Sequence, residues 1–192
     1  PAVLRLPLNF SLDGKMPLVV IPHDYGQISG VAFEREADFF SSRGFAVLSP
    51  NYRSTEGFGA DLRYADKGPM NNLILQDIDN GIEFLSKNYN LDMTRIHAIG
   101  FGYGGYLALM SAINYPNRYN SIAVVDPITD LSDFPDYMKG SLNGMFPQLI
   151  GLDTVSKELS PINHASKFKA NILLISDKKS RYHDQVKNMH KQ

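Results

Sequence analysis

Residues 99–109 read IGFGYGGYLAL, and this stretch decides how the rest of the chain is interpreted. The segment from Arg95 to Ile99 precedes it and is predicted to be a buried strand. Four glycines then fall within residues 100–105, a density typical of a tight turn. The residues from Tyr106 to Ala112 favour a helix. The sequence therefore predicts a strand, a sharp turn and a helix in immediate succession.

This succession has the layout of a nucleophile elbow but lacks the nucleophile. In hydrolases the pattern G-x-S-x-G places a serine hydroxyl at the apex of a strand-to-helix turn. The residue at the apex here is Gly102. Glycine has no side chain, so it cannot attack a carbonyl carbon. The chain is thus predicted to keep the scaffold of an acyl-transfer enzyme without its reactive atom.

The same glycines allow two other interpretations. They can serve only a tight turn and close helix packing, because glycine tolerates positive φ and has no Cβ. Gly100, Gly102 and Gly105 also fit G-x-G-x-x-G, a turn that can bind phosphate at the N-terminus of a helix. The acidic residue that this pattern needs further along the chain has one candidate, Asp126. Nucleotide binding therefore stays as a third hypothesis of function.

Composition excludes several classes of protein. The chain has 192 residues, enough for one domain with a substantial core. Its 19 basic and 20 acidic residues give a net charge of -1, which predicts no affinity for nucleic acid or membranes. No signal peptide or membrane-spanning run is visible, so a cytoplasmic location is favoured. The absence of cysteine and of metal-ligand spacing predicts no metal and no cofactor.

Short apolar runs alternate with segments of helical periodicity. We predict strands at 3–10, 18–21, 45–48, 96–99, 121–125 and 172–175. We predict helices at 31–43, 72–88, 106–113 and 183–191, a polar loop at 51–68, and irregular or helical structure at 128–170. In the first helix Phe33, Ala37 and Phe40 should share one face, with Gly44 as the stop. This alternation predicts a single α/β domain over residues 1–192, with a mostly parallel sheet flanked by helices on both faces.

Four segments resemble motifs of the catalytic domain of the prolyl oligopeptidase family of serine peptidases, which has the α/β-hydrolase fold. Residues 100–106 (GFGYGGY) resemble the family's G-x-S-Y-G-G-Y, and residues 51–59 (NYRSTEGFG) resemble its N-Y-R-G-S-x-G-Y-G. Residues 23–27 (HDYGQ) are similar to an eroded H-G-G-P-x-x-Q, and residues 160–165 (SPINHA) are similar to S-P-x-x-H-A. The resemblance implies a peptidase scaffold over most of the chain.

The resemblance also assigns the triad positions, and all three are vacant or doubtful. Gly102 occupies the nucleophile position. The family's acid, in a segment like L-L-I-H-G-x-x-D, falls on Ser180, with Asp177 three positions earlier as the alternative acid. The family's histidine lies further along in a glycine-flanked loop, whereas His183 and His190 come too early, on a predicted helix. A serine peptidase needs a hydroxyl, an imidazole and a carboxylate together.

The binding positions implied by the resemblance are partly retained. His23 and the backbone N–H of Tyr103 would line an oxyanion-type site, although His23 can equally be a polar loop residue. Asp24 and Tyr25 replace small glycines of the family and add a carboxylate where an anion should bind. Arg53 resembles the family arginine that stabilises the loops around the site, and a structural salt bridge is its expected role.

Two hypotheses of function follow from these residues. In the first, the chain is a prolyl-oligopeptidase-like domain that no longer hydrolyses peptides and acts as a binding or interaction module. Its expected partners are a peptide or small-molecule ligand and an upstream propeller-type domain, with this chain as a C-terminally truncated piece of a longer protein. In the second, it is a fragment or nucleophile variant of an active serine peptidase or esterase. Because loss of the nucleophile costs about 10⁶-fold in rate, the chain as written is not expected to be catalytic.

Overall fold

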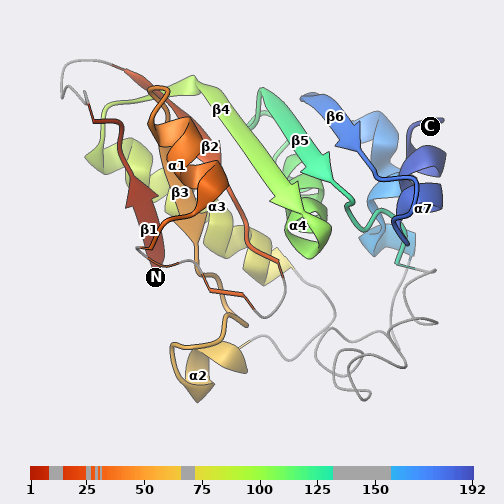
Figure 1. Ribbon diagram of the computed structural model, residues 1–192, viewed down its shortest axis with the longest axis horizontal. Helices are drawn as coiled ribbons and strands as arrows, with labels where there is room; N and C mark the ends of the chain where they lie inside the picture. Colours follow the sequence, from red (N-terminus) through yellow and green to blue (C-terminus); the bar gives the residue numbers. More distant parts are fainter. Residues whose placement is uncertain (9–14, 25–26, 29, 31, 66–71, 132–156) are drawn as a thin grey trace.

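A six-stranded sheet with helices on both faces organises the computed structural model (Figure 1). The structure describes residues 1–8, 15–24, 27–28, 30, 32–65, 72–131 and 157–192. The strand order is β1-β3-β2-β4-β5-β6, and every neighbouring pair is parallel except β1 and β3. This confirms the predicted α/β architecture with a mostly parallel sheet.

The elements follow the predicted order. The strands are β1 (Ala2–Arg5), β2 (Met16–Val20), β3 (Ala46–Pro50), β4 (Leu91–Phe101), β5 (Ser121–Val125) and β6 (Asn171–Ile175). The α-helices are α1 (Arg35–Ser41), α2 (Ala60–Arg63), α3 (Asn72–Asn88), α4 (Gly102–Asn114) and α7 (His183–Met189). Two 3₁₀ helices, η2 (Lys157–Leu159) and η3 (Pro161–Lys167), precede β6. The predictions for 132–156 and for 9–10 lie outside the described residues.

Several predicted boundaries were wrong. Helix α4 begins at Gly102 rather than at residue 106, and strand β1 ends at Arg5, although the predicted strand continued to residue 10. Helix α1 begins at Arg35 rather than near residue 31, because the Asp38 carboxylate accepts the N–H of Glu34 at 2.7 Å and fixes the start of the helix. Phe33 therefore precedes the helix and is 80% exposed. The predicted loop at 51–68 contains α2, a single turn that follows Gly59 at φ 93°. Strand β4 starts earlier than predicted, since Leu91 pairs with Met16 across a shift in register.

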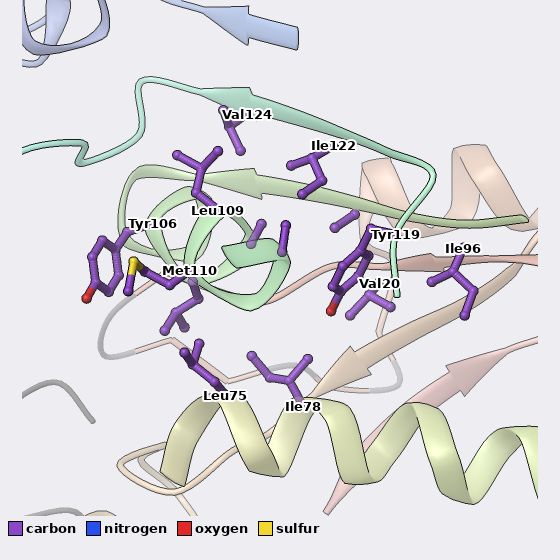
Figure 2. Close-up of a cluster of buried hydrophobic side chains, with 14 of the residues drawn as sticks. Val20, Leu75, Ile78, Ile96, Tyr106, Leu109, Met110, Tyr119, Ile122 and Val124 are labelled. Carbon is purple, nitrogen blue, oxygen red and sulfur yellow. The ribbon is translucent and has the colours of Figure 1, made fainter. Parts of the chain in front are cut away.

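The two faces of the sheet bury different side chains. Along β2, Leu18 and Val20 pack toward α3 and α4, whereas Val19 packs with Ala37 of α1. Such continuous apolar runs are expected for parallel strands covered on both faces. The larger core lies on the α3 and α4 side, where four apolar residues of α3 at helical spacing are at most 4% exposed. These residues are Leu75, Ile78, Ile82 and Leu85. Figure 2 shows two of them, Leu75 and Ile78, facing this core.

The sheet is covered less completely at β6. Ile172 and Leu174 pack against the larger core, but Leu173 and Ile175 are 56% and 44% exposed. Leu173 is in register with Ala123 of β5, which is in register with Ile99 of β4. Ile99 packs in the smaller core with Ala37 of α1, so Leu173 lies on the same face of the sheet as α1 but farther along it. Among the described residues, no helix is long and apolar enough to cross a membrane.

Candidate functional site

The predicted strand–turn–helix is present at the carboxyl end of β4. Strand β4 ends at Phe101 and α4 begins at Gly102, whose φ is 51°, in the left-handed region. A Cβ on Gly104 would lie 2.2 Å from the carbonyl oxygen of Pro22, and one on Gly105 would lie 3.0 Å from Pro127 Cβ. The turn is thus held closely between the loop after β2 and the loop after β5. Glycine is required here by packing, independently of any chemistry.

A carboxylate lies on this turn where a substrate oxyanion would be stabilised in a hydrolase. The backbone N–H of Tyr103, the residue after the apex, donates to Asp24 Oδ1 at 2.9 Å. In elbow hydrolases the N–H at this position forms part of the oxyanion hole. The N-terminus of α4 carries partial positive charge, so the contact with Asp24 is electrostatically favourable. The negative charge also disfavours the phosphate that the dinucleotide hypothesis would place here.

His23 supports the loop that carries Asp24. Its Nδ1 donates to the carbonyl oxygen of Asp24 at 2.8 Å, and its Nε2 accepts from the Thr55 hydroxyl at 2.9 Å. The ring stacks on Tyr52 with centroids 4.3 Å apart, and the Tyr52 hydroxyl donates to the His23 carbonyl at 2.7 Å. Burial lowers the pKa of His23, with Asp24 opposing the shift, and burial raises the pKa of Tyr52. Both ring nitrogens of His23 are therefore bonded within the protein, and the neutral form is favoured.

The N-Y-R loop is tied to α3 by an ion pair. The guanidinium of Arg53 donates to both carboxylate oxygens of Asp77, at 2.7 and 2.6 Å, and the Arg53 backbone N–H donates to the same carboxylate at 3.0 Å. Both side chains are 24% exposed. This bidentate geometry is the structural salt bridge expected for Arg53. The next residue, Ser54, has φ 73° at the position where the family motif has glycine.

The two residues named from the sequence as candidates for the acid position, Asp177 and Ser180, lie in a turn after β6. The Asp177 carboxylate accepts the backbone N–H of Lys179 at 2.7 Å, and its carbonyl accepts the N–H of Ser180 at 2.9 Å. The Ser180 hydroxyl accepts the N–H of Tyr182 at 3.2 Å, just before α7. These bonds shape the turn that leads into α7, a use of Asp and Ser side chains common in loops. Tyr25, also named from the sequence, lies outside the described residues.

A carboxylate–hydroxyl–imidazole chain lies beside this turn, and the sequence did not reveal it. The Ser176 hydroxyl donates to Asp126 Oδ1 at 2.9 Å, and His183 Nδ1 lies 3.3 Å from the Ser176 oxygen. Asp126 is held at φ 47°, and two residues later the N–H of Ile128 donates to the Gly102 carbonyl at 3.4 Å. The Ser176 hydroxyl thus lies between the Asp126 carboxylate and the His183 ring and links them. The signal available in the sequence was the pair Asp126-Pro127, which directly follows β5.

A cavity of about 400 Å³ adjoins the elbow. His23 and Asp24 line one side, Phe101 lies at the end of β4, and the start of α1 closes the other side with Glu34 and Glu36. Its volume falls in the range of small-molecule sites, roughly 300–1,000 Å³. Among the described residues, no group of three or more histidine, aspartate or glutamate side chains is arranged to hold a metal ion.

The fold and the elbow define the class of protein as one with the α/β-hydrolase fold. An acylaminoacyl peptidase from Pyrococcus horikoshii superposes with a TM-score of 0.80 at 23% identity, covering 98% of this chain and 33% of its own. A puromycin-hydrolyzing peptidase from Mycobacterium tuberculosis gives a TM-score of 0.85 at 20% identity, covering 98% and 30%.

The sequence model of the prolyl oligopeptidase family matches residues 31–179, and the chain belongs to this family of serine peptidases. The acylamino-acid-releasing enzyme of Sus scrofa is 27% identical over 191 residues, covering 94% of this chain and 26% of that protein. The enzyme of the same name from Arabidopsis thaliana is 24% identical and covers 83% and 22%. The chain spans about a quarter of the length of these curated relatives.

Proposed function

We propose that this chain is a prolyl-oligopeptidase-family domain that binds peptides without hydrolysing them at its elbow. The observation that carries the proposal is Gly102 at the first position of α4, where a peptidase needs its nucleophile. The hydrogen bonds of Ser180 and Asp177 within the turn after β6 support the same conclusion. The resemblance of the sequence to the family adds an upstream propeller-type domain as the expected partner.

The ligand class follows from the relatives and from the cavity. The matched proteins are named for the release of acylamino acids and for aminopeptidase activity. The cavity beside the elbow has the size of a site for a short peptide segment. A peptide that occupies it would lie next to Phe101 and Asp24.

A serine-reactive fluorophosphonate probe tests the loss of catalysis. The purified chain should show no labelling, because no hydroxyl is present at the apex, and an active relative serves as the positive control. Labelling that persists after denaturation and maps to the elbow region would overturn the proposal.

Peptide binding is tested separately by NMR titration. Short N-acetylated and free-amine peptides should shift the amide signals of Phe101 and of residues around the cavity, and mass spectrometry should recover both peptides intact. Shifts confined to other surfaces would contradict the assigned site, and cleaved product would contradict the assigned chemistry.

The alternative is an active serine peptidase or esterase of which this chain is a fragment or a nucleophile variant. The names of the relatives favour it. A Gly102→Ser chain that reacts with the probe would support this alternative, whereas an unreactive one would indicate that more than the nucleophile is missing.

A further inference from the structure

The position of the Asp24 carboxylate has a consequence for residue 102. Its Oδ1 accepts the Tyr103 N–H at 2.9 Å, so the donor that would stabilise an oxyanion is already bonded to an anion of the same chain. A Cβ built on Gly102 would lie 3.0 Å from Asp24 Oδ2 and 3.3 Å from both Cγ and Oδ1. These distances are shorter than ordinary van der Waals contact, so a side chain at the apex and the carboxylate compete for one space.

The loop that carries Asp24 is anchored from several sides. The Asp24 carbonyl accepts His23 Nδ1 at 2.8 Å and the N–H of Gln27 at 3.2 Å. His23 is 8% exposed and rests on Tyr52, which is 3% exposed. Just before them, the carbonyl of Pro22 packs directly on Gly104. Moving the carboxylate away from the elbow therefore requires breaking the Tyr103 hydrogen bond, the loop bonds, or both.

We propose that Asp24 is a built-in occupant of the oxyanion position and competes with any side chain at residue 102 for the same space. The carboxylate takes the hydrogen bond of Tyr103 and the favourable field of the α4 N-terminus, and it covers the apex of the turn. Restoring a serine at 102 alone would then displace Asp24 rather than create an accessible nucleophile. The contact concerns the same elbow as the proposed function, but its tests involve no measurement of hydrolysis, so the two can fail separately.

A double-mutant cycle measures the competition. Gly102→Ala, Asp24→Ala and the double variant are compared with the unchanged chain by urea unfolding. Asp24→Ala removes the carboxylate that crowds the new Cβ. Gly102→Ala should therefore cost less stability in the Asp24→Ala chain than in the unchanged chain. We expect the two substitutions to be coupled by about tenfold in the folding equilibrium constant, within the range for residues in contact. Asp61→Ala, which removes an exposed carboxylate on α2, is the matched control and should be additive with Gly102→Ala.

A second measurement applies even if the Gly102 variant fails to fold. In Asp24→Asn the side chain keeps its shape and loses its charge, so the amide proton of Tyr103 should move upfield and exchange faster with solvent. Additivity of Asp24→Ala with Gly102→Ala within a factor of two would overturn the proposal. A Tyr103 amide that is unchanged in a folded Asp24→Asn chain would overturn it as well.

Discussion

The elbow and the turn after β6 both lie at the carboxyl ends of strands, yet they retain different amounts of the family pattern. At the elbow, Gly100, Gly104 and Gly105 are each in closer contact than a Cβ would allow. After β6, Asp177 and Ser180 are held by turn bonds and by one bond from the Asp177 N–H to Asp126 Oδ1 at 3.2 Å, and residues 177–179 are exposed. The difference teaches that core packing constrains the backbone at the elbow, whereas the exposed turn after β6 is constrained mainly by its own hydrogen bonds.

The largest loss of stability is expected at Gly104, and its absence would contradict the difference between the two regions. Gly104→Ala should lower the free energy of unfolding by more than about 3 kcal/mol, because the new Cβ would lie 2.2 Å from the Pro22 carbonyl and the backbone must move. Chemical denaturation measures the loss. Gly30→Ala is the control, since its Cβ would meet its nearest atom at 3.9 Å, and it should change stability by less than about 0.5 kcal/mol. Equal losses in the two variants would contradict the packing argument.

An effect of intermediate size on stability is expected at the Arg53–Asp77 ion pair. Arg53→Ala should destabilise the chain by about 2 kcal/mol, because it leaves a partly buried carboxylate without its bidentate partner. Arg63→Ala breaks the more exposed pair with Glu56, at 3.0 Å, and should cost less than about 1 kcal/mol. Thermal unfolding of both variants gives the comparison, and a larger cost at Arg63 would refute the assigned role of Arg53.

His23 makes the elbow side sensitive to pH. Its pKa in the folded chain is below the ordinary 6.5, so the unfolded chain binds the proton first as the pH falls. The free energy of unfolding should therefore decrease as the pH is lowered below about 6.5, with a contribution from His23 of at most about 1.4 kcal/mol per pH unit. His97, whose pKa is also lowered by burial, contributes in the same direction. His23→Asn should reduce the slope, and a slope unchanged by this variant would contradict the contribution of His23.

The smallest effect is expected in the turn after β6, at Ser180. Ser180→Asp should change stability by less than about 0.5 kcal/mol, because an aspartate can accept the same N–H of Tyr182. It should also leave the chain unreactive toward the fluorophosphonate probe. A destabilisation comparable to that of Gly104→Ala would show that packing constrains both regions alike.

The sequence predicted the sheet because its strands are short apolar runs, and it predicted α3 because its apolar residues recur at helical spacing. It also placed Gly102 at the apex, since an elbow is a local pattern. It could not reveal the bond from Asp24 to Tyr103, which joins residues 79 positions apart. The link from Ser176 to Asp126 spans 50 positions and depends on the alignment of β5 with β6. The start of α1 was missed because it depends on one side-chain bond from Asp38.

The exposed apolar side chains of β6 have a consequence for contact with other surfaces rather than for substrates. Leu173 and Ile175, on β6, keep about half of their area in water. Covering such area is worth about 25 cal/mol for each Å². A surface that covers these two side chains would therefore gain hydrophobic free energy, and because the hydrophobic contribution weakens on cooling, this gain should be smaller in the cold.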